Sequence, residues 1–237
     1  MLNKKTIIIS LISTVLGMQN ALADQRITLG AKLLGAGWQG DNGAGGSSFN
    51  SDEGGQVAFS ASYTENKFYA GISLQNGNYT FTSTAPDQFT SSSRNPSSNV
   101  KIEHQEIDLL AGYYFWKQVS LFVDFKGVSN TWSNNNYKQN FGGLGFGASG
   151  YLPLNNSWTG FGSAGFVGGN VEDASNVKVG DGRSSGLEFG VIYRLNDDST
   201  INMGLKFRNY KFEYLDNSTQ DYSINALFVG YNHGFSF

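Results

Sequence analysis

The chain has 237 residues, no cysteine, a formal net charge of −3 at pH 7 and only 15% charged residues. The lack of cysteine excludes disulfides and thiolate chemistry. No run of Lys and Arg marks a nucleic-acid-binding face, so we expect no nucleic acid among the partners. Glycine (31), phenylalanine (18) and tyrosine (12) are abundant and proline (3) is scarce, a composition that favours strands and turns over helices.

The first 23 residues have the three regions of a secretory signal peptide. Two lysines give a basic start, an apolar stretch covers 7–16, and Ala21 and Ala23 form a small-x-small cleavage site. The apolar stretch is too short to span a bilayer, which needs about 20 residues. The sequence therefore predicts export and cleavage before Asp24, with residues 24–237 as the folded domain.

Apolar residues then recur at every second position in segment after segment. The expected strands lie at 27–33, 56–64, 68–74, 106–115, 119–126, 144–152, 158–169, 187–195, 201–207 and 227–237. Their apolar faces carry no Asp, Glu, Lys or Arg, and no apolar stretch after the signal is long enough for a membrane-spanning helix. A closed barrel is the other structure that satisfies every backbone polar group in lipid, and its signature is this alternation.

The sequence thus predicts an all-β fold, a closed antiparallel up-and-down transmembrane β-barrel of ten strands. Eight strands remain the alternative, if 68–81 or 158–169 fails to pair. The second of these segments is ambiguous, because Ala164 and Phe166 face lipid in one phase and Phe161 and Val167 in the other. A soluble β-sandwich is the competing fold, but its exposed faces should carry charge.

Short and long connections alternate between the expected strands. The short ones lie at 65–67, 116–118, 153–157 and 196–199, and the longer ones at 38–54, 75–99, 132–139, 170–184 and 214–220. Short periplasmic turns and long extracellular loops are typical of transmembrane barrels. Aromatic residues beside the short connections fit an interfacial girdle.

The end of the chain adds a more specific signal. Tyr231 and Phe235 lie on the last apolar face, and Phe237 is the final residue. In these features the chain resembles the small outer-membrane β-barrel proteins of Gram-negative bacteria, the porin-like and opacity-type barrels. The resemblance implies a location in the cell outer membrane, contact with its lipid and lipopolysaccharide, and a C-terminal signal read by the barrel-assembly machinery. Members often have glycine five residues before the final aromatic, where this chain has Asn232.

The inward phase of the strands carries the charges in nearly equal numbers. The expected lumen network comprises Lys32, Glu106, Asp108, Asp124, Lys126, Glu188, Arg194, Lys206 and Arg208. Buried charges must be paired or hydrated, and small barrels have interiors that side chains can fill. The balance indicates a mostly filled polar lumen, with a narrow porin-like channel for ions or small solutes as the alternative.

Three functions follow as hypotheses. The long loops, rich in Gly, Ser, Asn and Thr, favour a role in envelope structure or in adhesion to a host or surface ligand. A channel is the second hypothesis. An outer-membrane hydrolase is the third, but we expect no enzyme, because His104 and His233 lack an acid or nucleophile at a motif spacing and are expected to be loop-packing or interfacial residues. No cofactor or metal is expected, because two separated histidines without cysteine do not form a tight metal site.

Overall fold

The computed structural model describes residues 25–90 and 93–237, which form eleven strands and no helix. The strands are β1 (Arg26–Asp41), β2 (Ser48–Asn50), β3 (Glu53–Glu65), β4 (Phe68–Phe89), β5 (Arg94–Trp116), β6 (Val119–Trp132), β7 (Lys138–Pro153), β8 (Trp158–Asp173), β9 (Lys178–Arg194), β10 (Ser199–Tyr214) and β11 (Thr219–Ser236). The predicted signal peptide, with Ala21, Ala23 and Asp24, lies outside the described residues.

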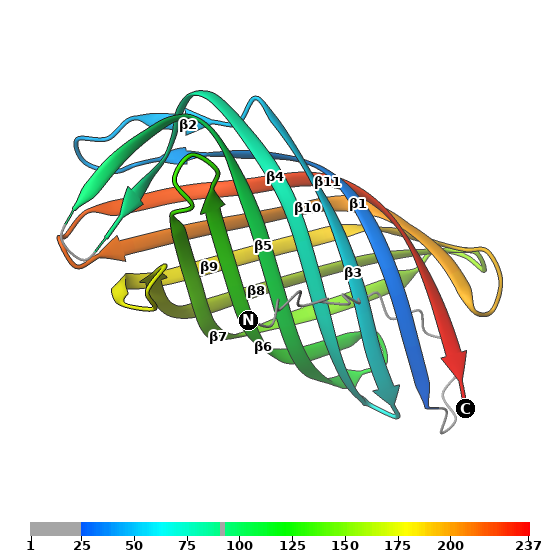
Figure 1. Ribbon diagram of the computed structural model, residues 1–237. Helices are drawn as coiled ribbons and strands as arrows, with labels where there is room; N and C mark the ends of the chain where they lie inside the picture. Colours follow the sequence, from blue (N-terminus) through cyan, green and yellow to red (C-terminus); the bar gives the residue numbers. More distant parts are fainter. Residues whose placement is uncertain (1–24, 91–92) are drawn as a thin grey trace, which may run out of the picture.

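Ten of the strands close into one antiparallel barrel (Figure 1). Each pairs with its neighbour in the chain, and β11 pairs with β1 from Arg26↔Ser236 to Asp41↔Asp221. The short β2 pairs only with the last three residues of β1. The ten-stranded barrel is therefore confirmed, and the eight-stranded alternative is wrong, because the segments at 68–81 and 158–169 both pair on two sides.

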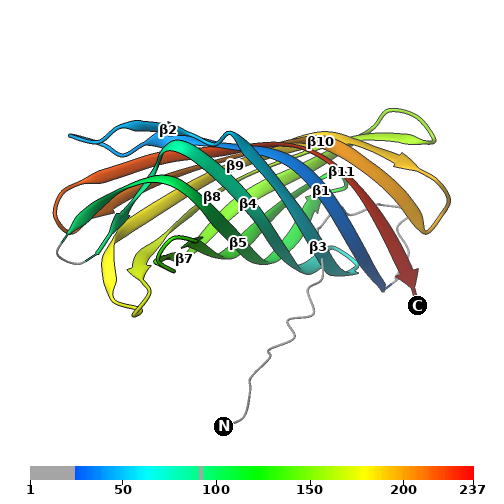
Figure 2. The same ribbon diagram turned by 45° about the horizontal axis from the view of Figure 1, so that its top comes forward.

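The barrel has two unlike ends (Figure 2). At one end, here called the turn end, lie the connections 66–67, 117–118, 154–157 and 195–198 together with the start of β1 and the end of β11. At the other, the loop end, lie 42–52 with β2, the end of β4 and the start of β5, and the connections 133–137, 174–177 and 215–218. Asn136, Asn176 and Asn217 have φ of 56°, 59° and 64° in three loop-end turns, a left-handed conformation that asparagine tolerates.

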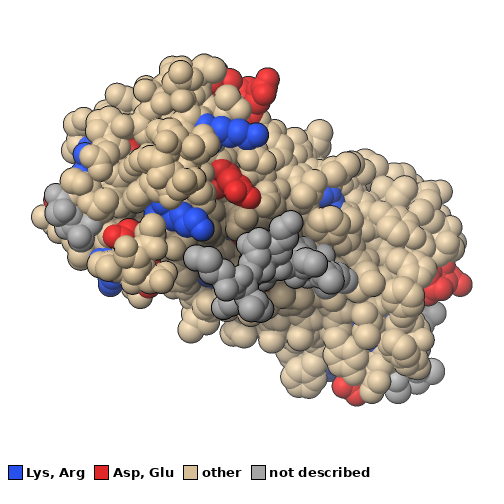
Figure 3. Space-filling model, viewed as in Figure 1, with Lys and Arg blue, Asp and Glu red and all other residues tan. Residues whose placement is uncertain are grey.

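The sides of the barrel near the turn end form a belt of exposed apolar side chains. Leu33, Val123 and Phe146 expose 64%, 63% and 70% of their surface and alternate with inward polar positions. Figure 3 shows a broad uncharged surface on this face, with most of its Lys, Arg, Asp and Glu side chains gathered at the loop end. The charge-free faces predicted from the sequence thus lie outward, which is the arrangement that lipid requires.

The ambiguous strand β8 takes one clear phase. Phe166 is exposed, whereas Val167 is buried and Phe161 packs against the inward cluster around Phe228.

The neighbouring β7 is rich in glycine because bulky lumen side chains lie over it. A Cβ added at Gly147 would collide with the ring of Phe122, so glycine there makes room for a large inward side chain.

The prediction of long loops from the sequence is mostly wrong. The segment predicted as a loop at 75–99 is strand up to Phe89 and again from Arg94, with register shifts at 81–84 and 85–88. The predicted loops at 38–54 and 170–184 are likewise largely strand. The residues of these segments still alternate, so the strands continue past the apolar belt. The phase is inverted there, with polar residues outward and apolar residues inward. The loop half of the barrel is built like a water-soluble barrel with its own core.

None of the residues that the structure describes forms a helix long and apolar enough to cross a membrane.

Candidate functional site

The lumen at the loop end is filled by an apolar core, here called the plug. Its buried members are Trp38, Phe49, Tyr79, Phe81, Ala85, Phe89, Val100, Ile102, Val128, Trp132, Phe141, Val167, Val171, Val179, Tyr210, Phe212, Tyr214, Tyr222 and Ile224. Every long strand except β3 contributes at least one of them, so the side chains meet from all around the mouth. Close-packed aromatic side chains leave few voids larger than a water molecule.

The tip of the β4–β5 hairpin crosses this mouth. The Phe89 ring stacks on Tyr214 of β10, with ring centroids 3.7 Å apart. On another side, the indole N–H of Trp132 donates to the carbonyl of Pro86 at 3.1 Å, and the Tyr137 hydroxyl donates to the carbonyl of Phe89. Since β10 is not a neighbour of β4 in the sheet, these contacts span the opening rather than run along the wall.

Buried amide side chains form further hydrogen bonds in the plug. Asn42 donates to the carbonyl of Ala85 at 3.1 Å, and Gln220 donates to Asn42 Oδ1 at 2.9 Å. Gln139 donates to the Tyr214 hydroxyl at 2.5 Å. All three amide side chains are almost completely buried. Hydrogen-bonded amides of this kind fix one arrangement of a buried interface, because any other would leave polar groups unpaired.

Outside the apolar belt, the Asp52 carboxylate links the segment before β3 to β4. Asp52 accepts hydrogen bonds from the backbone N–H of Thr82 at 2.7 Å and from its hydroxyl at 2.8 Å. These bonds lower the pKa of the Asp52 carboxyl below its ordinary value.

Beneath the plug lies a layer of charged side chains centred on Glu106. The carboxylate of Glu106 accepts from Lys126 at 3.0 Å, from Lys206 at 3.3 Å and from the Tyr210 hydroxyl at 2.8 Å. Lys126 also donates to Asp108. Lys126 belongs to the adjacent strand β6, whereas Lys206 and Tyr210 reach Glu106 from β10 across the lumen. The charged layer therefore bridges the barrel directly.

A second bridge joins other walls of the lumen. Lys32 of β1 donates to Glu188 of β9 at 2.5 Å, and the Lys32 ammonium lies 4.3 Å from the centroid of the Phe228 ring. Arg208 lies 3.8 Å from both Glu106 and Asp108. Seven of the nine predicted network residues thus contact one another, five of them around Glu106 and two in the Lys32–Glu188 pair.

The remaining two predicted network residues lie apart from these contacts. Asp124 is half-buried on β6, and among the described residues it has no hydrogen bond or ion pair. Arg194 is the last residue of β9, at the turn end, remote from the charged layer. The sequence pattern gives the face on which a charge lies but not which charges meet across the lumen.

The two histidines occupy different environments. His104, expected at a loop or interface, is instead buried under the plug, where Nδ1 lies 2.7 Å from Asn130 Oδ1 and Nε2 lies 3.8 Å from Glu106. His233 faces outward near the turn end, with Nδ1 3.0 Å from the Ser199 hydroxyl. The hydrolase hypothesis gains no support from either, because His104 is closed off by the plug and His233 lies in the apolar belt.

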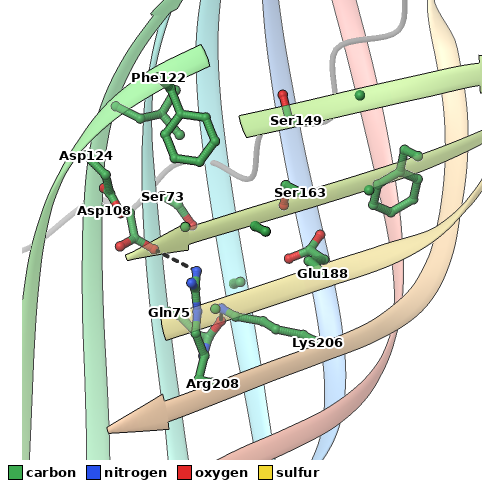
Figure 4. A pocket seen from close by; sticks show the side chains of 18 of the residues that line it. Ser73, Gln75, Asp108, Phe122, Asp124, Ser149, Ser163, Glu188, Lys206 and Arg208 are labelled. Carbon is green, nitrogen blue, oxygen red and sulfur yellow. Dashed lines mark hydrogen bonds and ion pairs between the residues drawn. The ribbon is translucent and has the colours of Figure 1, made fainter. Parts of the chain in front are cut away.

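A cavity of about 170 Å³ lies in the lumen on the turn-end side of the plug (Figure 4). Charged, hydroxyl and aromatic side chains share its wall, among them Asp108, Asp124, Glu188, Lys206, Arg208, Ser149, Ser163 and Phe122. The lumen is therefore not completely filled. Sequence reasoning missed both this cavity and the plug, although the inverted alternation of apolar residues at the strand ends was a usable signal for the plug.

The predicted assembly residues lie at the turn end. Tyr231 and Phe235 face outward on β11, and Phe237 follows the strand, its backbone N–H bonded to the carbonyl of Gln25 at 3.0 Å. The nearby Asn232 faces the lumen and is buried.

No protein-family model matches the sequence, and no curated protein matches it in sequence. Solved structures are similar in fold. The outer membrane protease OmpT from Escherichia coli has a TM-score of 0.55 at 8% identity, over 90% of this chain and 97% of that one. The translocator domain of the autotransporter NalP from Neisseria meningitidis scores 0.42 at 12% identity, over 90% and 89%, and the beta domain of the Bordetella autotransporter BrkA scores 0.41 at 13% identity, over 90% and 99%.

Of these three likenesses, the one to OmpT is high enough to establish a shared fold, and at 8% identity it establishes nothing beyond the fold. The charge-free belt, the ten-stranded closure and this likeness all indicate the same fold. The chain has the fold of an outer-membrane β-barrel, and its surface suits that location.

Proposed function

We propose that the protein is an integral outer-membrane barrel that closes its own lumen and presents its loop end outside the cell as a rigid surface for contact. The observation that carries this proposal is the plug, in which the β4–β5 hairpin tip reaches Tyr214 across the mouth. A barrel built to conduct has no use for a closely packed apolar core in its lumen. A contact surface gains from one, because it holds the loop-end strands rigid above the membrane.

The partners follow from the same proposal. Lipid and lipopolysaccharide of the outer membrane surround the apolar belt. The barrel-assembly machinery reads the last strand, with Tyr231, Phe235 and Phe237. A host or surface ligand is contacted by the outward polar side chains of the loop end. Removing 78–96 is a poor test of such contact, because Tyr79, Phe81 and Phe89 belong to the plug.

A narrow channel is the second candidate, favoured by the polar cavity beneath the plug. Conductance separates the two functions. Refolded protein in planar bilayers is expected to show no single-channel steps at any voltage or salt concentration, because the plug leaves no water-filled path. Steps that depend on the amount of inserted, folded protein would overturn the closed-barrel proposal and establish the channel.

The orientation is tested by labelling in intact cells. Because the chain has no cysteine, Ser175→Cys and Asn196→Cys each provide one thiol at an exposed position, in a loop-end and a turn-end connection respectively. A membrane-impermeant maleimide is expected to label the first in intact cells and the second only after lysis. Both variants should be recovered in the outer-membrane fraction. Labelling of the turn-end cysteine alone in intact cells would invert the proposed orientation.

A further inference from the structure

The lumen cavity exists because one of its walls carries small side chains. Strands β7, β8 and β9 supply Ser149, Gly162, Ser163, Gly165 and Gly186 to its lining, beside the larger Tyr151, Phe161, Glu188 and Ile192. The facing strands β4, β5, β6 and β10 supply mostly long polar or aromatic side chains, and no glycine. Large residues on both walls would have filled the lumen, as they do in the plug.

The charged groups around the cavity are almost all paired. Lys32 and Glu188 contact each other at 2.5 Å. Lys206 donates to Gln75 at 2.7 Å and to Glu106 at 3.3 Å. With Asp108 and Lys126, these groups satisfy one another, which is the arrangement expected of buried charges.

Two groups of opposite sign are left poorly paired. Among the described residues, Asp124 has no hydrogen bond or ion pair, and its Oδ1 is a buried oxygen without a donor. Arg208 approaches Glu106 and Asp108 only to 3.8 Å, beyond hydrogen-bond distance, and its Nε also lacks a partner. Both residues line the cavity. A guanidinium and a carboxylate in such a site ordinarily have close partners.

The positions of these two groups suit one small molecule. The register pairs Asp108 with Lys126 and Leu110 with Asp124, so the two aspartates are diagonal neighbours, about 7–8 Å apart. Figure 4 shows Asp108 between Asp124 and Arg208. Asp124 and Arg208 therefore lie on either side of Asp108 in the wall of the cavity.

We propose that the cavity binds a small zwitterion of the amino-acid class. Its ammonium group donates to the Asp124 carboxylate and its carboxylate accepts from the Arg208 guanidinium, with the hydroxyls of Ser149 and Ser163 beside it. A zwitterion is favoured over a simple cation or anion because the surrounding charges balance. Asp108, Asp124 and Glu188 stand against Lys32, Lys206 and Arg208 in the cavity wall, and behind it Glu106 and Lys126 pair with each other. A ligand with a net charge would leave one buried charge unmatched.

The volume limits the size of the ligand. An engineered cavity of about 150 Å³ holds a benzene molecule, so the 170 Å³ found here accommodates about six to eight non-hydrogen atoms. L-alanine and γ-aminobutyrate fall in this range and differ in the spacing of their charges. Comparing the affinities of the two molecules shows which separation between ammonium and carboxylate the site prefers.

The test is titration of refolded protein in detergent micelles, followed by NMR of labelled methyl groups. The methyls of Leu110 and Ile192 line the cavity, whereas that of Ile224 lies in the plug and serves as an internal reference. At least one of the two amino acids is expected to shift the cavity methyls saturably and leave Ile224 unchanged. Butylamine, butyrate and 1-butanol, which match γ-aminobutyrate but lack one or both charges, are expected to bind at least tenfold more weakly.

Three variants complete the design. Asp124→Asn keeps the shape, removes the charge and is expected to weaken amino-acid binding at least tenfold. Ser163→Leu fills the cavity without removing a charged group and is expected to abolish binding. Glu103→Gln changes an outward carboxylate beyond the cavity and should bind like the unaltered protein. A cavity that holds water only, shown by methyls that respond to neither amino acid, overturns the proposal. So does equal binding by the Asp124→Asn variant.

Discussion

Replacing Lys126 with methionine is expected to lower the free energy of unfolding by about 3–5 kcal/mol. Lys126 is completely buried and donates to Glu106 at 3.0 Å and to Asp108. Methionine fills a similar volume but leaves two carboxylates in the lumen with one cation fewer. Lys206 and Tyr210 still hold Glu106, so the loss falls mainly on Asp108, for which Arg208 at 3.8 Å is the nearest remaining cation.

The measurement is denaturant unfolding of protein refolded in detergent, followed by circular dichroism and by the gel mobility of the folded barrel. Adding Asp108→Asn to Lys126→Met removes the stranded charge and should recover about half of the loss or more. The control is Lys178→Met, which breaks an exposed ion pair with Asp181 and should cost about 0–1 kcal/mol. Equal losses in the two single variants would mean that the lumen network contributes no more than a surface pair.

The belt half of the barrel could be predicted from the sequence because its determinants are local. Period-two alternation places Val123 outward and Lys126 inward without knowledge of any partner strand. The exclusion of charge from the outward face follows from the cost of burying it in lipid. The same reasoning gave the inward face of each charged residue in the lumen.

The loop half could not be predicted in the same way. Apolar residues there face inward, and between Phe81 and Phe89 two register shifts and Pro86 interrupt the alternation. The Ser- and Asn-rich composition of the hairpin is also typical of loops. Contacts across the lumen, such as Lys206 with Glu106, depend on the diameter and stagger of the closed barrel, and a sequence pattern contains neither. The same limit hid the cavity and the burial of His104.

Trp38 gives the second large expected effect, and it measures how much the plug contributes to stability. The indole is completely buried, and its centroid lies 5.1 Å from the ring of Tyr222, 5.2 Å from Tyr79 and 5.8 Å from Phe81. Trp38→Ala is expected to cost about 3–5 kcal/mol, because the packed plug cannot collapse around so large a cavity. Denaturant unfolding of the refolded barrel measures this loss.

Trp38→Phe is the matched variant, since it keeps an aromatic ring in the plug. Among the described residues the Trp38 Nε1 has no hydrogen-bond acceptor, so phenylalanine sacrifices no polar contact and leaves a smaller cavity, and it should cost clearly less than Trp38→Ala. Hydrogen exchange locates the damage. In Trp38→Ala, amides of β4 and β5 near the loop end should lose protection, while those in the apolar belt, such as Val123, keep it. A uniform loss along the barrel would show that the plug and the belt unfold as one cooperative unit, and the loop end could not then be regarded as a separately stabilised surface.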